Sequence, residues 1–280
     1  MRYFFMVVSI IAVLMPSVWA ENNPDLILGY KIVANDTLNV RIFYPAGLRP
    51  VDKRPAIVFF YGGGWNNAHP KQFYPHSDYL ASRGMVAICA DYRTKSTHNT
   101  TPIECVKDGK SAIRWVRRHA IELGIDPDKL VAGGGSAGAH VAAATATLSG
   151  FNEAGEDTTI SARPNALVLF NPVLDTGPDG YGYSRVKDYW HDFSPAHHID
   201  QHTPPCIILL GTDDHVVPVE IAKSFKASVE KAGGRCDLVL YDGLGHGFYL
   251  EDKYFETLTE VDRFLASLRY IEGEPTLNRK

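Results

Sequence analysis

Residues 133–138 read Gly-Gly-Gly-Ser-Ala-Gly, and this stretch decides the fold. It follows the apolar residues 130–132 and precedes the alanine-rich residues 139–146, which predicts a strand, a sharp turn and then a helix. The glycine and alanine neighbours of Ser136 leave room for a crowded backbone, so the hydroxyl can be held above the end of a sheet. The spacing Gly-x-Ser-x-Gly over 134–138 is typical of a nucleophile elbow.

The same six residues also satisfy Gly-x-Gly-x-x-Gly, the spacing of a dinucleotide-binding loop. That loop requires an acidic residue about 20 positions later, at the end of the next strand, to hold the ribose. Glu153, Glu156 and Asp157 lie instead in a polar loop, and the next predicted strand, 166–170, ends at Asn171. The pattern favours a nucleophile over a nucleotide site, and we expect no cofactor.

The composition is that of an ordinary globular protein. Of 280 residues, 45% are hydrophobic and 21% are charged, with a formal net charge of −4. The sequence has no basic stripe and no run of like charge, which argues against a nucleic-acid partner. No Pro/Ser-rich linker or internal repeat divides residues 21–280, so we expect one large α/β domain there.

Residues 1–20 differ from the remainder of the chain. Arg2 precedes a short apolar core, and Val18 and Ala20 occupy the −3 and −1 positions of a cut after Ala20. These features predict a secretory signal peptide, hence a secreted or periplasmic protein without stable membrane association after cleavage. The alternative is an N-terminal membrane anchor. The apolar stretch is shorter than the roughly 20 residues that cross a bilayer, which favours cleavage.

Short apolar segments alternate with helical patterns along residues 21–280. The first two strands alternate apolar and polar residues and predict an antiparallel hairpin at a sheet edge. The later strands are short and unalternating, which predicts burial on both faces of a parallel sheet. The expected strands are 26–33, 38–44, 56–60, 86–90, 130–132, 166–170, 207–210 and 238–241, and the expected helices are 73–83, 103–122, 137–148, 220–232 and 255–268.

The predicted fold is therefore an open, doubly wound α/β sheet of eight mostly parallel strands with helices on both faces. Such sheets place their functional sites outside the carboxyl ends of the strands. The helix after Ser136 carries a smooth face of alanines that allows close packing on the sheet. Its N-terminus directs partial positive charge toward Ser136, which favours negative charge that develops there.

A glycine-rich loop ends the third predicted strand, where residues 61–65 read Tyr-Gly-Gly-Gly-Trp. Three consecutive glycines often form only a flexible turn. A serine that attacks a carbonyl, however, needs N–H donors around the oxyanion that forms, and glycines expose their N–H groups without obstruction. We assign Gly63 and Gly64 as oxyanion donors, completed by the N–H of Ala137.

An acid and a base follow the last two predicted strands. Neighbouring residues that leave a strand point in opposite directions, so either Asp213 or Asp214 can face the site. His246 lies between glycines after the final strand and completes the chain order Ser, Asp, His. In such a relay the histidine accepts the serine proton and returns it to the leaving group, while the carboxylate orients the imidazole ring.

These residues resemble the α/β-hydrolase family over nearly the whole of residues 21–280. The resemblance runs through Tyr-Gly-Gly-Gly-Trp, Gly-Gly-Ser-Ala-Gly, Gly-Thr-Asp-Asp-His-Val-Val-Pro and Gly-His-Gly-Phe. It is closest to secreted bacterial esterases near the hormone-sensitive-lipase and acetyl-xylan or feruloyl esterase groups. In that pattern the acid is the third residue after the strand-end glycine, which implies Asp214. Tyr61 departs from the pattern, because a histidine usually stands there and shapes the oxyanion loop.

The resembled fold places a cap over the site, formed by the insertion after the sixth strand. Here that insertion is 172–200, which is rich in aromatic residues. Its aromatic rings could stack on a sugar or a phenolic acid, or form the cap's own small core, and both interpretations stay open. Trp65, beside the glycine loop, is expected to form a pocket wall. The candidate substrate-binding residues are Trp65, Tyr181, Tyr183 and Trp190.

Four histidines are the candidate ligands of a metal site. His191, His197, His198 and His202 lie close in sequence, but no cysteine or carboxylate pattern accompanies them, so we expect no metal.

An even number of cysteines in an exported protein permits disulfide bonds. Cys206 and Cys236 both open strands and are the better candidates for a bridge, while Cys89 and Cys105 complete the set. A buried free cysteine in an apolar run behaves as a small hydrophobic residue, and free thiols are favoured.

The sequence as a whole predicts an exported serine carboxylesterase that hydrolyses short acyl esters through an acyl-enzyme. Acetyl or feruloyl groups on a polysaccharide are the expected targets, and the substrate is the expected partner. Two alternatives stay open: a serine peptidase of the same fold, and a non-catalytic binding protein on a hydrolase fold.

Overall fold

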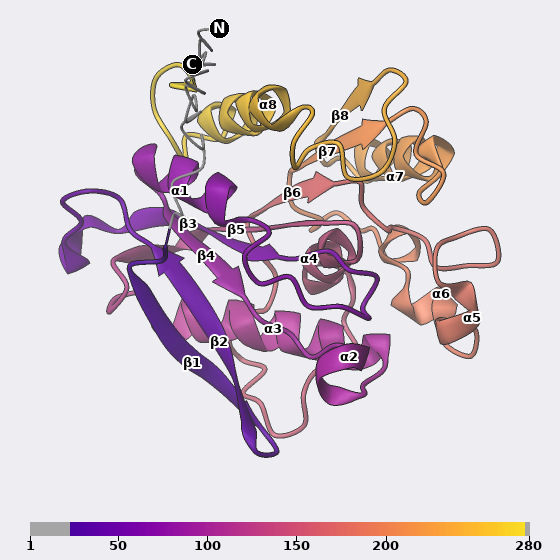
Figure 1. Cartoon of the computed structure of the whole chain (residues 1–280), viewed down its shortest axis with the longest axis horizontal. Coiled ribbons are helices and arrows are strands. Elements are labelled where there is room, and N and C mark those ends of the chain that lie inside the picture. Colours follow the sequence, from indigo (N-terminus) through magenta and orange to yellow (C-terminus); the bar gives the residue numbers. More distant parts are fainter. Residues whose placement is uncertain (1–22, 278–280) are drawn as a thin grey trace, which may run out of the picture.

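The computed structural model describes residues 23–277, and its core is one sheet of eight strands. The strand order is β1-β2-β4-β3-β5-β6-β7-β8 (Figure 1). The strands are β1 Leu26–Val33, β2 Asp36–Phe43, β3 Arg54–Phe60, β4 Val86–Ala90, β5 Ile125–Gly135, β6 Ala166–Phe170, β7 Cys206–Gly211 and β8 Cys236–Tyr241. The predicted mostly parallel sheet is confirmed.

Strand direction divides the sheet into an antiparallel edge and a parallel body. β1 pairs antiparallel with β2, and β2 pairs antiparallel with β4. All the other neighbours pair parallel. The predicted hairpin at the edge is therefore confirmed, and the carboxyl ends of the six parallel strands meet along one rim of the sheet.

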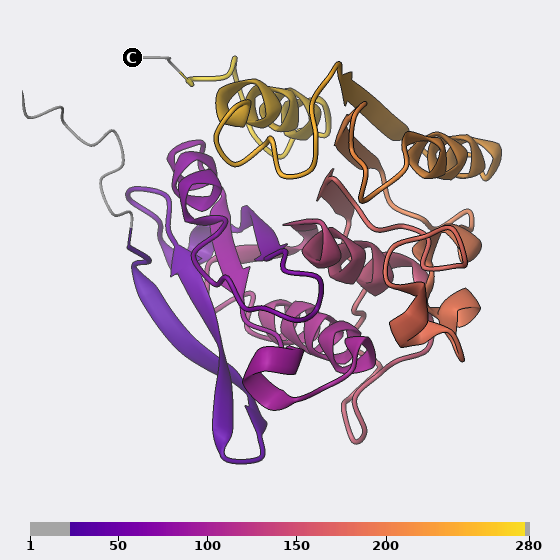
Figure 2. The same ribbon diagram turned by 45° about the vertical axis from the view of Figure 1, so that its right-hand side comes forward.

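Helices cover both faces of the sheet, as predicted. Side chains alternate between the faces along each strand: Val58 and Phe60 of β3 belong to one apolar cluster, and Ile57 and Phe59 to the other. Figures 1 and 2 show α1 and α8 on one side, with α3 and α4 on the other. The main helices are α1 Tyr74–Ser82, α3 Pro102–Arg118, α4 Ala137–Thr147, α7 Val219–Lys231 and α8 Tyr254–Ser267.

Most element boundaries lie close to the predicted ones, but β5 and α3 differ more, and β5 already begins at Ile125 where a start at 130 was expected. The glycines at 133–135 are not a turn but the last residues of β5, where Gly133 pairs with Phe59 of β3 and with Val168 of β6. Glycine is tolerated there because strands on both sides hold its backbone. The helix expected over 103–122 ends earlier, at Arg118. The sharp turn that the sequence predicts is therefore confined to Ser136.

The predicted signal peptide, 1–20, lies outside the described residues. Across residues 23–277, the structure has no helix that combines the length and the apolar character needed to cross a membrane. The four cysteines are buried and free, in keeping with the favoured interpretation. Cys206 and Cys236 stand directly opposite each other on β7 and β8.

Two histidines are fully buried in the helical layers and make the fold acid-sensitive. Burial lowers the pKa of His76 on α1 to about 3 and that of His140 on α4 to about 4, because the imidazolium would lose its hydration. In the unfolded chain both groups have a pKa near 6.5. The unfolded state therefore binds more protons below about pH 6.5, and stability falls as the pH decreases toward 4.

We expect His76→Phe to remove part of this acid sensitivity. Both ring nitrogens of His76 lack a hydrogen-bond partner within residues 23–277, so phenylalanine sacrifices no bond there. Urea unfolding at pH 7.5 and at pH 4.5 measures the effect. The wild-type protein loses unfolding free energy between these two pH values, and in His76→Phe this loss should be smaller by roughly 2–3 kcal/mol at most. His202→Gln, at an exposed position, is the control. An unchanged pH dependence in His76→Phe would contradict the assignment.

Candidate active site

Ser136 lies on a strained turn between β5 and α4. Its φ and ψ are 55° and −122°, a region that non-glycine residues rarely adopt. Its backbone N–H donates to the Phe170 carbonyl of β6 at 2.9 Å, which fixes the turn to the neighbouring strand. The serine therefore stands at the carboxyl rim of the sheet, as the motif predicted.

Close packing explains the last glycine of the motif. A Cβ atom on Gly138 would overlap the carbonyl oxygens of Phe60 and Tyr61, at the end of β3. The first turn of α4 thus touches the backbone that leads into the glycine-rich loop. This contact places Ser136 beside the start of the glycine-rich loop, because a Cβ on Gly62 would lie 3.4 Å from the Ser136 Cβ.

The structure brings the predicted serine, histidine and acid into one hydrogen-bonded chain. His246 Nε2 lies 2.9 Å from Ser136 Oγ, and His246 Nδ1 lies 2.7 Å from Asp214 Oδ2. The three residues come from the ends of β5, β7 and β8, which meet only in the folded sheet. This geometry is that of a nucleophile, a base and an acid that orients the base.

Burial decides between the two adjacent aspartates. The Asp214 side chain is 0% exposed, whereas Asp213 is exposed to solvent. Burial by itself would raise the pKa of Asp214, but hydrogen bonds from His246 and from the backbone outweigh it and lower the pKa. The backbone donors are the N–H groups of Val216 and Val217, each 2.9 Å from Oδ1. Asp214 is thus held as a carboxylate.

Asn171 is a positioning residue that sequence reasoning missed. Its Nδ2 donates to Asp214 Oδ2 at 2.8 Å, and its Oδ1 accepts a 3.4 Å hydrogen bond from the Gly247 N–H. It is fully buried and has a φ of 43°. The amide therefore ties the acid to the loop that carries His246. Its position directly after β6, at the same rim, was the available signal.

We expect Asn171→Gly to lower kcat for a simple ester by about ten- to a hundredfold, with little change in KM. Glycine tolerates the positive φ while removing both amide hydrogen bonds, and a bond to a charged group contributes about 1.5–3 kcal/mol. Steady-state kinetics with p-nitrophenyl acetate provide the measurement. A rise in KM at constant kcat would instead place Asn171 in substrate binding.

Two backbone N–H groups of the glycine-rich loop donate no hydrogen bond in the part of the chain that the structure describes. Gly63 and Gly64 have φ values of 134° and 63°, which glycine adopts without strain. The Gly62 N–H is occupied, because it donates to Gln72 Oε1 at 2.5 Å. The N–H groups of Gly63, Gly64 and Ala137 have no such bond within residues 23–277. They are the three donors assigned from the sequence.

Two tyrosines hold the start of this loop in place of the usual histidine. The Tyr61 hydroxyl donates to the Tyr92 carbonyl at 2.8 Å, and the Tyr92 hydroxyl donates to the Tyr61 carbonyl at 2.6 Å. Their rings stack with centroids 4.3 Å apart. Burial raises the pKa of both phenols, so both remain donors. Tyr92 and Gln72 were not singled out in the sequence.

Comparison with solved structures decides the family. The apo form of Thermogutta terrifontis esterase 2 is 44% identical, with a TM-score of 0.86 over 91% of this chain and 97% of that chain. The same esterase phosphorylated by paraoxon is 45% identical, with a TM-score of 0.85 over 89% and 96% of the two chains. The chain belongs to the α/β-hydrolase family.

Sequence comparisons place this α/β hydrolase among esterases. Residues 41–177 match the BD-FAE family. An acetylxylan esterase of Xylanibacter ruminicola is 29% identical over 69% of this chain and 41% of its own length. Esterase LipQ of Mycobacterium tuberculosis is 30% identical over 66% of this chain and 48% of its own length. The chain spans about half the length of the curated relatives it matches.

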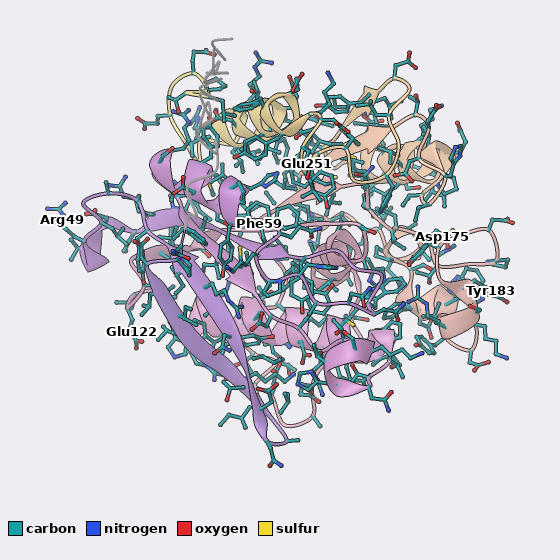
Figure 3. The ribbon with its side chains drawn as sticks, viewed as in Figure 1. Arg49, Phe59, Glu122, Asp175, Tyr183 and Glu251 are labelled. Atoms are coloured by element: carbon teal, nitrogen blue, oxygen red, sulfur yellow. The ribbon has the colours of Figure 1, made fainter. Side chains whose placement is uncertain are left out.

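Of the four predicted substrate-binding aromatics of the α/β hydrolase, Trp65 and Tyr181 lie beside the glycine-rich loop. Trp65 is 1% exposed and packs against His140 and Tyr181, and it also lines a small cavity beside the glycine-rich loop, as predicted for a pocket wall. The Tyr181 hydroxyl lies against Gly64. Trp190 stacks edge-on with histidines of the same segment. Figure 3 shows Tyr183 at the outer edge of the molecule, well apart from Phe59 in the sheet.

The short helices of the 172–200 segment lie between β6 and β7. They are α5 Tyr183–Val186, α6 Trp190–Phe193 and the 3₁₀ turn Pro195–His197. His140 of α4 hydrogen-bonds through Nε2 to the Phe193 carbonyl at 2.9 Å. This contact joins the segment to the helix that begins after the serine.

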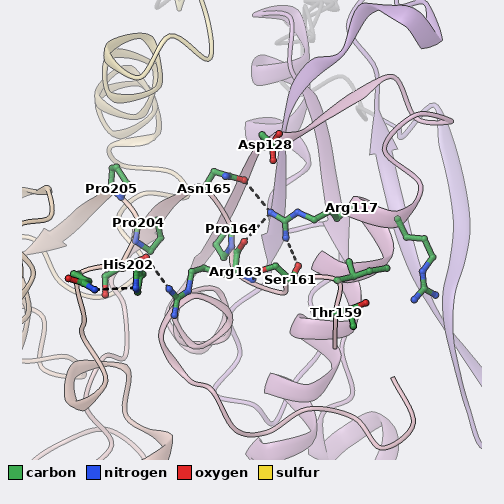
Figure 4. Close-up of a pocket in the computed structure, with 14 residues that line it drawn as sticks. Arg117, Asp128, Thr159, Ser161, Arg163, Pro164, Asn165, His202, Pro204 and Pro205 are labelled. Carbon is green, nitrogen blue, oxygen red and sulfur yellow. Dashed lines mark hydrogen bonds between the residues drawn. The ribbon is translucent and has the colours of Figure 1, made fainter. Parts of the chain in front are cut away.

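A cavity of the α/β hydrolase lies at the opposite rim from Ser136. It has a volume of about 730 Å³ and adjoins the residues that precede β6 and β7 (Figure 4). The guanidinium of Arg117 donates there to the carbonyls of Pro127, Ser161 and Arg163. Because these backbone carbonyls occupy the guanidinium donors, Arg117 has a structural role at this cavity.

Three of the four clustered histidines stay together in the structure: the His191 ring centroid lies 4.7 Å from that of His197 and 6.0 Å from that of His198. His191, Asp192 and His198 place one potential ligand atom each within 4.8 Å of one another at the surface. His197 lies 3.4 Å from the Asp175 carboxylate, and His202 lines the cavity at the opposite rim. Of the four histidines, His202 is therefore the one that lies apart from the others.

Proposed function

We propose that the protein is a serine carboxylesterase that acts through an acyl-enzyme. The observation that carries this proposal is the unbroken chain of hydrogen bonds from Asp214 through His246 to Ser136. The similarity of this protein to a solved esterase, over nearly the full length of that esterase, supports the same reaction class. In this proposal Ser136 is the nucleophile, His246 the general base and Asp214 the orienting acid.

The reaction proceeds in two balanced halves. Ser136 Oγ attacks the ester carbonyl carbon while its proton moves to His246 Nε2. The tetrahedral intermediate then expels the alcohol, which takes that proton, and leaves an acyl-enzyme. Water attacks the acyl-enzyme with His246 again as base. Collapse of the second intermediate releases the carboxylic acid and returns the proton to Ser136.

The free N–H groups of Gly63, Gly64 and Ala137 stabilise the oxyanion in both halves. Their value lies in being fixed before the charge develops, since donors that need no reorganisation stabilise a transition state most. The Tyr61–Tyr92 pair and the Gln72 side chain supply that rigidity. The N-terminus of α4 adds partial positive charge on the same side.

Short acyl esters are the proposed substrates, with acetyl or feruloyl groups on a polysaccharide as the natural targets. Solved structures of the Thermogutta terrifontis esterase carry bound propionate and butyrate, both short acids. The acetylxylan esterase relative supports a polysaccharide ester. The 172–200 segment would act as a small cap, and residues 1–20 would direct export to the periplasm or the medium.

Labelling by paraoxon tests the proposed function. We expect one phosphoryl adduct per chain by intact mass, mapped to Ser136 by peptide analysis, with loss of p-nitrophenyl acetate hydrolysis. Acetylated xylan, methyl ferulate and p-nitrophenyl esters of increasing chain length are then assayed side by side. Cleavage of aminoacyl p-nitroanilides without ester cleavage would favour a peptidase. Absence of an adduct and of turnover would favour a binding protein.

A further inference from the structure

A smaller cavity opens directly beyond the proposed oxyanion loop. It has a volume of about 270 Å³ and lies between Trp65, residues 95–102 and Arg185 of α5. Trp65 follows Gly64 in the chain, so the cavity begins one residue past an oxyanion donor. Its two loop walls are fixed together, because the Lys95 N–H donates to the Trp65 carbonyl at 3.1 Å.

The wall of this cavity is cationic. Lys95 and Arg185 line it, and none of its eight lining residues is Asp or Glu. Arg185 is held between two rings, with its guanidinium carbon 5.0 Å from the Trp65 centroid and 5.1 Å from the Tyr181 centroid. One of its nitrogens donates to the Gly64 carbonyl. The plane of the guanidinium is thus fixed before a ligand arrives.

Two buried polar atoms of the lining residues are unsatisfied. Trp65 Nε1 and Thr100 Oγ1 have no hydrogen-bond partner within residues 23–277. A buried donor without a partner costs free energy, and such groups usually pair with water or a ligand. The indole N–H can only donate, and the hydroxyl can donate as well as accept. Together with the two cations, they make a site that suits a negatively charged group with several acceptor oxygens.

We propose that this cavity is a subsite for a carboxylate on the alcohol portion of the ester, as in a uronic acid residue of an acetylated polysaccharide. The proposal rests on the esterase function proposed above and specifies its substrate. The cavity is large enough for one sugar ring. The side chains of Asn66 and Asn99, which also line it, offer hydrogen bonds to the ring hydroxyls.

The experiment compares kcat/KM for a monoacetylated methyl galacturonoside and for the corresponding neutral galactoside. We expect the wild-type protein to prefer the galacturonoside, and the preference to weaken with added salt. In Lys95→Ala the ratio of the two kcat/KM values should fall by about tenfold, because a charge-assisted contact is lost. Lys95→Glu should invert the preference.

Lys187→Ala is the matched control, because Lys187 is exposed just after α5 and does not line the cavity. The ratio of the two kcat/KM values in Lys187→Ala should equal that of the wild type. If this ratio fell as much in Lys187→Ala as in Lys95→Ala, the preference would come from the overall positive charge, and the subsite would be overturned. A ratio near one in the wild type, with p-nitrophenyl acetate still hydrolysed, would overturn the subsite alone. If the wild-type protein hydrolysed none of these esters, the proposed function itself would be wrong.

The position of the carboxylate needs its own comparison. Mono-p-nitrophenyl succinate carries the carboxylate on the acyl side, and p-nitrophenyl butyrate is its neutral counterpart. A preference for the succinate that depends on Lys95, without one for the galacturonoside, would overturn the assignment to the alcohol portion.

Discussion

Ser136→Ala is expected to lower kcat for p-nitrophenyl acetate by about 10⁵-fold. Without Oγ no acyl-enzyme forms, and the remaining N–H donors can assist only direct attack by water. The residual rate should be unaffected by paraoxon, since the atom that it phosphorylates is absent. Stopped assays at high enzyme concentration, with the protein purified away from host esterases, are needed to measure so low a rate.

Two controls separate the lost nucleophile from a lost fold. The melting temperature and circular dichroism of Ser136→Ala should match those of the parent, because the one hydrogen bond of the Ser136 side chain within residues 23–277 is that to His246. A double variant with His246→Ala should be no slower than either single variant, since residues that act as a unit are not additive. Retention of more than about a hundredth of the activity would mean that another group attacks the ester.

Asp214→Asn is expected to lower kcat by about 10³–10⁴-fold. The carboxylate accepts a hydrogen bond from the His246 Nδ1–H and so leaves Nε2, the basic nitrogen, facing Ser136. An asparagine that presents its NH₂ to Nδ1 would stabilise the wrong tautomer and could not stabilise the imidazolium. Kinetics between pH 6 and 9 measure this effect, and the deficit should be large throughout that range.

Asp213→Asn is the matched control for this prediction. The two residues are adjacent, and the same charge is removed, but Asp213 is exposed whereas Asp214 is buried against His246. We expect Asp213→Asn to keep kcat within about twofold of the wild type. Comparable losses in both variants would mean that net charge near the site matters more than the hydrogen bond.

Local patterns account for the parts of the site that could be predicted from the sequence. The six residues around Ser136 combine an apolar strand, a turn that only small residues fit and a helix, and each signal acts over a few positions. The chain order of Ser136, an aspartate and His246 follows from alternating strands and helices. Parallel strands bring their carboxyl ends to one rim, so the rim itself could be anticipated.

Contacts between distant segments account for what could not be predicted. Asn171 joins residues after β6, β7 and β8 through a single amide, and its position directly after β6 shows that it lies at the rim but not which residues it binds. Tyr61 and Tyr92 replace a missing histidine by bonds that cross from β3 to β4. The contacts of Trp65 with Tyr181 and Arg185 likewise come from a later segment, so the sequence did not show how deeply the ring is buried beside its cavity.

The sequence by itself determined the elbow, the mostly parallel sheet and the residue types of the proposed relay, because these depend on local periodicity and on small residues at a turn. Only the tertiary structure decided that Asp214 is the buried aspartate, that glycines 133–135 are strand, and that a cationic cavity adjoins the oxyanion loop. Those outcomes depend on which side chains from separate strands pack together and are shielded from water. Such contacts exist only after the whole sheet has assembled.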